Sequence, residues 1–266
     1  HLEEARALRR TGAPGRRLKA FELLKAAAAI RPDGELRQEW IAASAWPDLR
    51  EDAGFLPFRT PTGNVGFDFP VQRCALAWND IHVFDLASGQ QLHRLADASG
   101  SVGWLRFSPD GHWLSARHHQ EDFAWWELAT GKAIHRLSAP HSLVPDSASD
   151  FSPDSRVLAG SGSQTNVRLF EVETGRTLKT LAPMRHHRSL RFSPDGTLLA
   201  VTAGTQIELW DWARGVVKAA VTNQTEANWL AWHPQGRWLA FAGEDGSIGF
   251  WHWSEAQGLA VDYSLP

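Results

Sequence analysis

Two histidine pairs are the residues of this sequence best suited to metal chemistry. His118-His119 is followed by Glu121 and Asp122, and the second pair is His186-His187. Imidazole and carboxylate groups bind metals well, but adjacent residues of a strand point to opposite faces and neither pair has an established ligand spacing. The glycine-rich stretch Gly160 to Ser163 would hold phosphate only ahead of a helix, and a strand pattern follows it. We therefore predict polar loops here, with no metal ion, no cofactor and no catalytic residue.

Composition excludes several classes of protein. Cys74 is the only cysteine, so no intrachain disulfide forms. The 27 basic and 30 acidic residues give a net charge of −3, which provides no electrostatic reason to expect a nucleic-acid partner. The sequence contains no run of about 18 apolar residues, so we predict no membrane span within this chain.

The element that positions most side chains is a unit of three short strands and two turns, best seen from Arg191 to Gly215. Phe192 ends the first strand, and Ser193 to Gly196 form a tight turn. Leu198 to Val201 and Ile207 to Trp212 are the next two strands. The unit is a β-meander of about 25 residues.

This unit recurs along the chain with a period of about 40 residues. One marker is the aromatic residue before each Ser-Pro-Asp-like turn, at Phe107, Phe151, Phe192 and Trp232. A second is the aromatic residue of the third strand, at Trp126, Phe170, Trp210 and Trp251. Four short strands per repeat at this period predict an all-β propeller, whose blades stack radially.

The string Phe-Ser-Pro-Asp-Gly at 192–196, followed by Ile-Glu-Leu-Trp-Asp at 207–211, resembles the WD-repeat β-propeller family. The family's aspartate before the third strand is present only as Asp245, and the Gly-His pair is absent. Most blades therefore lack the hydrogen-bond network of the best repeats, and we expect packing by the 14 tryptophans to hold them together.

The N-terminal region favours helices over residues 2–10, 16–28 and 35–45, which we expect to pack as a short helical hairpin. The segments Glu4 to Gly12, Gly15 to Leu24 and Ala45 to Arg50 resemble the stretch that joins a bacterial serine/threonine kinase domain to a C-terminal WD-repeat propeller in planctomycete-type proteins. The resemblance implies a longer parent kinase, bacterial and either cytoplasmic or tethered at the cytoplasmic membrane facing the periplasm. This chain itself has no kinase motif.

Two domains are predicted. Residues 1–52 form a helical linker, and residues 53–266 form the propeller. Its five visible four-stranded blades cover approximately 53–97, 101–137, 142–181, 186–221 and 226–262, and we expect them to be part of a larger ring.

Two functional hypotheses follow. The first is a non-catalytic propeller for protein–protein interaction, scaffolding or sensing, which binds a protein or peptide as the regulatory part of a kinase. The alternative is a propeller enzyme with catalytic groups around a central channel, which would need acidic, histidine or metal-ligating residues from several blades to converge there.

The partner is expected on the face opposite the stereotyped Ser-Pro-Asp turns. Loops on that face differ from blade to blade, and binding residues tend to lie on loops held by a rigid scaffold. They are predicted to gather imidazole, basic and aromatic groups of the kind found at interfaces. The candidate residues are His118, His119, Gln120, His141, Arg185, His186 and Trp229.

Overall fold

The structure is a computed structural model that describes residues 1–8, 16–30, 34–44, 65–68, 72–77, 80–95, 102–118, 123–137, 149–161, 166–181 and 188–265. It divides into two compact units, His1–Pro57 and Phe58–Pro266. Residues 45–64 lie outside the described part, so the boundary at 52/53 and the blade limits stay predictions.

The first unit contains three helices, α1 (Leu2–Leu8), α2 (Arg16–Ile30) and α3 (Gly34–Ser44). Their common core contains Ala5 of α1, Ala20 and Leu24 of α2, and Leu36 and Ala43 of α3. All three helices contact one another, so this unit is a small three-helix cluster where the sequence predicted a hairpin. The short α1 joins the cluster because small side chains such as Ala5 let it approach α2 closely.

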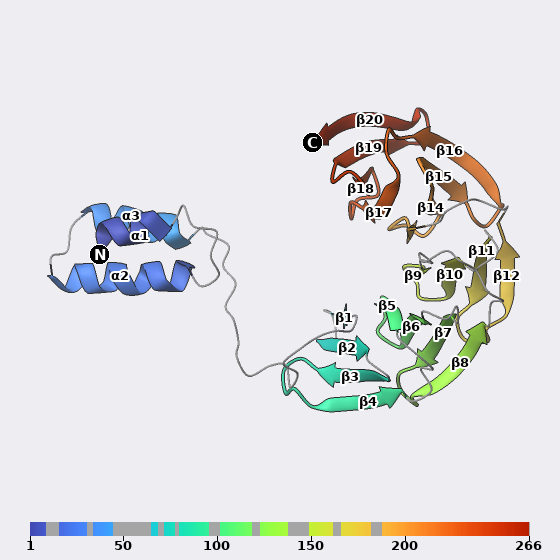
Figure 1. Ribbon diagram of the computed structural model, residues 1–266, viewed down its shortest axis with the longest axis horizontal. Coiled ribbons are helices and arrows are strands. Elements are labelled where there is room, and N and C mark those ends of the chain that lie inside the picture. Colours follow the sequence, from blue (N-terminus) through green and yellow to red (C-terminus); the bar gives the residue numbers. More distant parts are fainter. Residues whose placement is uncertain are drawn as a thin grey trace. The chain divides into compact units, whose positions relative to one another are not determined.

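The second unit consists of five antiparallel sheets of four strands each, which we call blades one to five. This confirms the predicted fold class. Figure 1 shows the blades one after another along an arc, with the first strand of each blade on the inner side and the fourth on the outer side.

The bounds of the strands, by blade, are as follows. Blade one contains β1 (Val65–Asp68), β2 (Arg73–Ala77), β3 (Ile81–Asp85) and β4 (Gln91–Leu95). Blade two contains β5 (Val102–Phe107), β6 (Trp113–His118), β7 (Phe123–Glu127) and β8 (Lys132–Leu137). Blade three contains β9 (Ser149–Phe151), β10 (Val157–Ser161), β11 (Val167–Glu171) and β12 (Thr177–Thr180). Blade four contains β13 (Leu190–Phe192), β14 (Leu198–Ala203), β15 (Gln206–Asp211) and β16 (Val216–Thr222). Blade five contains β17 (Ala227–Trp232), β18 (Trp238–Gly243), β19 (Ile248–Ser254) and β20 (Gly258–Leu265).

Strand register confirms that the repeated aromatic residues are equivalent. In blade two, Phe107 pairs with Leu114, which pairs in turn with Trp126. The same path recurs in the other blades, as Phe67–Cys74–Phe84, Phe151–Leu158–Phe170, Phe192–Leu199–Trp210 and Trp232–Leu239–Trp251. Both sequence markers therefore lie at one fixed level of every blade.

The Ser-Pro-Asp turns have a common hydrogen-bond scheme that explains their recurrence. In blade three, the Ser152 hydroxyl donates to the Asp154 carboxylate at 2.6 Å and accepts from the Val157 amide at 2.9 Å. Asp154 also accepts from the Arg156 amide at 3.1 Å. Equivalent bonds form around Ser108 and Ser193. A short hydroxyl and carboxylate thus satisfy the turn's backbone groups, which fixes where the second strand begins.

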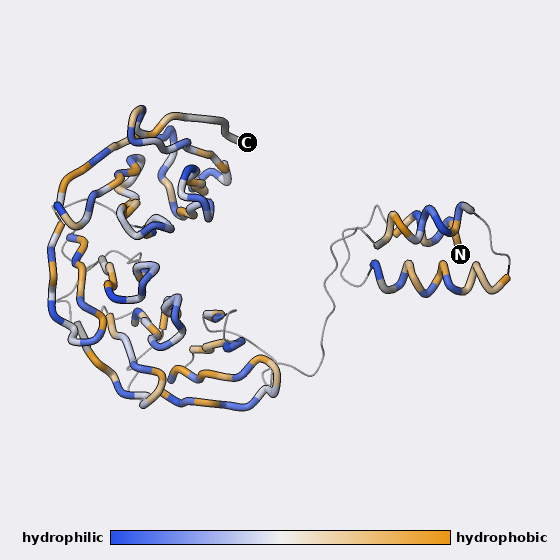
Figure 2. The backbone as a smooth tube through the Cα atoms, turned by 180° about the vertical axis from the view of Figure 1, so that it is seen from behind, coloured by the Kyte–Doolittle hydropathy of each residue, from blue (hydrophilic) through white to orange (hydrophobic). Residues whose placement is uncertain are grey.

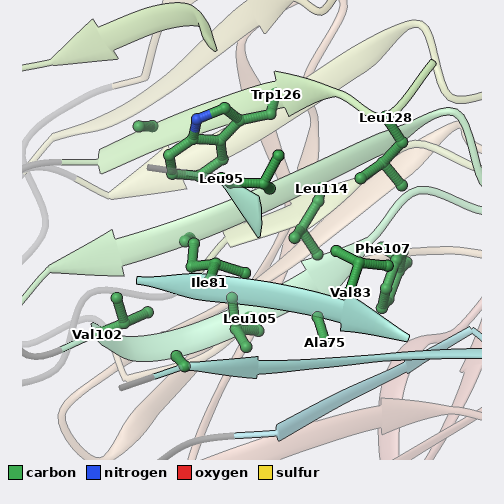
Figure 3. Close-up of a cluster of buried hydrophobic side chains, with 13 residues drawn as sticks. Ala75, Ile81, Val83, Leu95, Val102, Leu105, Phe107, Leu114, Trp126 and Leu128 are labelled. Atoms are coloured by element: carbon green, nitrogen blue, oxygen red, sulfur yellow. The ribbon is translucent and has the colours of Figure 1, made fainter. Parts of the chain in front are cut away.

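The core lies between consecutive blades. Hydrophobic and hydrophilic positions alternate along the strands, as Figure 2 shows by colour, so each blade presents apolar residues to its neighbours. Figure 3 shows the cluster between blades one and two, to which Ile81 and Val83 of blade one and Leu105 and Trp126 of blade two belong. Between blades two and three the buried Trp125 donates its indole N–H to the Val172 carbonyl at 2.8 Å. Aromatic packing between blades is therefore supplemented by specific hydrogen bonds.

Candidate functional site

The innermost strands bring charged residues from three blades together. In each innermost strand, one residue directly precedes the repeated aromatic residue. In blades two and three its side chain reaches the next blade, since Arg106 pairs with Asp150 and Asp150 accepts a hydrogen bond from the Phe192 amide. The residues at this position in blades one to five are Gly66, Arg106, Asp150, Arg191 and Ala231. We call this set the inner layer.

Asp150 is the centre of the inner layer. One of its carboxylate oxygens pairs with Arg106 Nε at 2.5 Å. The other accepts a hydrogen bond from the Phe192 amide at 2.8 Å. Asp150 is 5% exposed, so this carboxylate links blades two, three and four out of contact with solvent.

Arg191 adds a second cation beside the same carboxylate. Its guanidinium donates to the Leu190 carbonyl at 2.6 Å. Burial lowers the pKa of Arg191 to about 10, and the positive charge of Arg106 acts in the same direction, against the attraction of Asp150. Two arginines therefore share one aspartate, and the inner layer carries an excess positive charge.

Two tryptophans meet on the side of the inner layer away from the turns. Trp104 of β5 and Trp229 of β17 lie with ring centroids 4.9 Å apart and an interplanar angle of 36°. Each follows a β-bulge, between Val102 and Trp104 and between Ala227 and Trp229. Bulges re-aim the side chain that follows them, and β9 and β13 pair without one. The two bulges therefore distinguish the blades whose indoles project inward.

A pocket of about 460 Å³ opens on the side of the Ser-Pro-Asp turns, which we call the turn face. Its charged lining residues are Arg106, Asp150 and Asp68, of which Asp68 is paired with Arg73. Its rim includes Pro109, Pro153 and Pro194, which come from three consecutive turns. Phe67 of blade one, 49% exposed, completes one wall. The pocket therefore combines an apolar rim with charged groups.

Most of the predicted interaction residues lie outside the described part of the chain. These are His119, Gln120, His141, Arg185 and His186. His118 is the last residue of β6, where its backbone pairs with Val102. Trp229 was predicted in a loop, but it lies within β17 and projects inward, because the bulge lets the strand begin at Ala227. The structure thus describes one predicted side chain, and it belongs to the indole pair.

Sequence reasoning missed Arg106, Asp150 and Arg191. It looked for one residue type repeated at one position, whereas the blades carry different types at the same position. The signal was available, because each of the three directly precedes a repeated aromatic residue. Within the described ranges, no group of three or more histidine, cysteine or acidic residues is placed to hold a metal ion. The described helices also include none long and apolar enough to cross a membrane.

Comparisons with known proteins agree with the fold. A family model described as WD domain, G-beta repeat matches residues 176–211 and 221–252. The chain is 29% identical over 154 residues to Activating molecule in BECN1-regulated autophagy protein 1A of Danio rerio, which covers 56% of this chain and 11% of that protein. It is 23% identical over 154 residues to Pre-mRNA-processing factor 19 homolog 2 of Arabidopsis thaliana, covering 58% and 29%.

A third similar protein is WD repeat-containing protein VIP3 of Arabidopsis thaliana, 30% identical over 130 residues, which covers 42% of this chain and 40% of that protein. The chain therefore spans between 11% and 40% of the length of these three relatives.

Proposed function

We propose that this β-propeller, whose residues 176–211 and 221–252 match the WD domain, G-beta repeat model, is a non-catalytic module that binds a protein or peptide partner. The observation that carries the proposal is the Trp104–Trp229 pair. Trp229 is 49% exposed, although it sits on a strand of a rigid blade and stacks on another indole. Exposed, pre-ordered aromatic side chains supply much of the binding energy at protein interfaces. We place the partner's contact at this pair.

The alternative of an enzyme in a central channel is not favoured by the inner layer. Charged residues from several blades do converge there, but both oxygens of Asp150 are engaged, by Arg106 and by the Phe192 amide. A carboxylate held in this way has no free oxygen directed at a substrate proton. The names of the three relatives describe an activating molecule, a processing factor and a repeat protein, which also fits a binding role.

The finer expectation makes the propeller the regulatory part of a bacterial serine/threonine kinase. It rests on the resemblance of the N-terminal helical segment alone, and the three relatives are proteins of eukaryotes. The expectation therefore stays a prediction, together with the bacterial origin and the tether. The coding sequence that adjoins this segment in its genome tests it, since a kinase domain requires a Gly-rich loop and a catalytic-loop aspartate.

The predicted face of His118, His119, Gln120, His141, Arg185, His186 and Trp229 is part of the proposal. Histidines change charge between about pH 5 and 8, so binding through this face would change over that range. Substituting Arg185→Glu together with His186→Ala tests the loop residues. Unchanged affinity in that double variant, with loss of affinity after substitution in the Asp110 or Asp195 turns, would place the partner on the turn face.

Site-directed crosslinking tests the contact at the indole pair. A photoreactive benzoylphenylalanine replaces Trp229 in the full chain in its host cells, and Leu92 of β4, 43% exposed, carries the same group in the control. We expect crosslinks to a defined protein from position 229 only. With that protein purified, Trp229→Ala should weaken binding by about tenfold or more, whereas Leu92→Ala should not. Equal crosslinking from both positions would contradict the proposal.

A further inference from the structure

We propose that the turn-face pocket binds a carboxylate group of a peptide, which contacts the Arg106 guanidinium at the pocket wall. The inference rests on the proposed function only in taking a peptide as the ligand. Its site is the opposite face from the predicted loops, and its residues are different.

The inner layer holds two positively charged side chains and one negatively charged side chain. Asp150 is the only acidic residue of the inner layer, and its two oxygens are already used by Arg106 Nε and the Phe192 amide. Arg106 contacts Asp150 through its Nε, and a third of its side chain is exposed, so an anion can approach this side chain from the pocket. Among the described residues, Arg191 donates a hydrogen bond only to the Leu190 carbonyl, which is neutral, so this hydrogen bond does not neutralise the positive charge of Arg191. An anion at the pocket wall would supply the counter-charge.

The Arg106 side chain is accessible from the pocket. Its side chain is 33% exposed and lines the pocket, whereas that of Asp150 is 7% exposed. The guanidinium is a planar fork whose geometry matches a carboxylate. Arg191 lies beside it and strengthens the positive field, because burial removes the water that would screen its charge.

The volume and the lining of the pocket suit a small ligand group. Its volume of about 460 Å³ lies in the range of small-ligand sites, about 300–1,000 Å³. Pro109, Pro153 and Pro194 line it together with Phe67, which is 49% exposed. These groups suit apolar residues on either side of the carboxylate. The ligand is therefore an acidic residue within an apolar peptide segment, or a peptide C-terminus with an apolar last residue.

The position of the indole pair determines the side from which a peptide carboxylate would enter the pocket. The Trp104–Trp229 pair lies two residues along the strands from Arg106 and Ala231, a distance of about 7 Å. It stands on the side away from the turns. The carboxylate therefore enters from the turn face, and an indole contact on the other side would not need this pocket.

The probes are fluorescent six-residue peptides with proline, leucine and phenylalanine around one central position. That position is glutamate in one set and glutamine in a matched set, both with amidated ends. A third set has glutamine and a free C-terminus, and a fourth has phosphoserine. Binding to the full chain is measured by fluorescence anisotropy. The first and third sets distinguish a side-chain carboxylate from a terminal one, and the fourth reports a preference for phosphate.

Three substitutions make the test specific to the pocket. Arg106→Gln should reduce binding of the carboxylate peptides by about tenfold or more, because it removes the charged donor. Asp150→Asn should strengthen binding, because it removes the competing carboxylate while its amide oxygen still accepts from the Phe192 amide. The matched control is Arg94→Gln, which breaks the ion pair between Asp80 and Arg94, a residue of β4 on the outer edge of blade one and away from the inner layer. It should leave binding unchanged.

Thermal unfolding followed by circular dichroism verifies that each variant folds. Arg106→Gln leaves Asp150 its hydrogen bond from the Phe192 amide and the positive charge of Arg191 nearby. If Asp150→Asn does not fold, Arg191→Gln takes its place, with weaker binding expected. Equal affinity for the glutamate and glutamine peptides, tighter binding of phosphoserine than of either carboxylate, or no binding at all overturns the inference. Loss of binding in Trp229→Ala with no effect of Arg106→Gln also overturns it, but leaves the proposed function standing.

Discussion

Trp104 and Trp229 contact each other although they belong to the second and fifth blades, with ring centroids 4.9 Å apart. Their positions are equivalent, because each lies three residues before the repeated aromatic residue and each follows a bulge. The two indoles therefore connect blades that do not follow one another in the chain.

This contact predicts an energetic coupling between the two blades. Aromatic pairs contribute about 0.5–1.5 kcal/mol beyond the area they bury, so Trp104→Ala and Trp229→Ala should show a coupling of that size in a double-mutant cycle. The free energy of unfolding is measured with urea. Trp104→Ala combined with Leu92→Ala is the control and should be additive. Additivity in the tryptophan pair as well would mean that the indoles do not meet in solution.

Two buried tryptophans offer a matched test of indole hydrogen bonding. Trp125 Nε1 donates to the Val172 carbonyl, whereas Trp251 Nε1 is buried without a partner in the described structure. Trp125→Phe should lose about 1–3 kcal/mol more stability than Trp251→Phe, because only the first leaves a buried carbonyl unpaired. Urea unfolding of both variants gives the comparison, and equal losses would show that the hydrogen bond contributes nothing.

The ion pair at the junction of blades one and two should contribute far more to the free energy of unfolding than an exposed ion pair does. Asp68 is 3% exposed and pairs with Arg73 at 2.6 Å, and Arg73 also donates to the Gly111 carbonyl of blade two. Arg73→Met leaves a buried carboxylate unpaired, which costs about 3–5 kcal/mol. Arg94→Met breaks the exposed pair with Asp80 and should cost about 0–1 kcal/mol. Similar losses in the two variants would refute the buried character of the first pair.

The turn serines should make stability depend on pH. The Ser152 hydroxyl, followed by the Arg156 amide, lowers the pKa of Asp154 below its ordinary value of 3.8. The ionised carboxylate therefore adds stability above the unfolded-state pKa, and this contribution is lost as pH falls through the lowered folded-state pKa. Ser152→Ala removes the main cause. It should destabilise the chain more at about pH 7 than at about pH 3.

Urea unfolding at the two pH values measures this difference. The control is Ser254→Ala, whose hydroxyl accepts from the Gln257 amide in the β19–β20 turn, a contact that involves no carboxylate. Its effect should be the same at both pH values. If the stability lost in Ser152→Ala does not change with pH, the hydroxyl stabilises the turn only through its hydrogen bond to the backbone.

The sequence predicted the blades well because each repeat carries its own local signals. The Ser-Pro-Asp turn satisfies its backbone groups within a few residues, and the aromatic residue before it fixes the register of the first strand pair. These interactions are local, so a pattern in the sequence is sufficient to locate them. The same holds for helices α2 and α3, whose ends differ from the predicted ones by no more than two residues.

The inner layer could not be predicted in the same way, because it depends on contacts between repeats. Arg106 meets Asp150 only when blades two and three lie side by side, and nothing near Arg106 in the sequence indicates that partner. The inward direction of Trp229 depends on a bulge at Asn228, and asparagine is typical of turns, so its presence does not indicate a bulge. The loop residues from His119 to His186 that carried the predicted face lie largely outside the described ranges.

The inner layer also has a consequence for the charge of the pocket. Glycine, arginine, aspartate and alanine all occupy this one position, while the strand pairing of the neighbouring aromatic residue stays the same in every blade. The residue at this position is nevertheless fitted to its neighbours, because a side chain on Gly66 would meet Leu105 and because Asp150 contacts both adjacent blades. In blades two and three this position also lines the pocket, so a substitution at Arg106 or Asp150 would change the charge of the pocket while the strand pairing beside it stays the same.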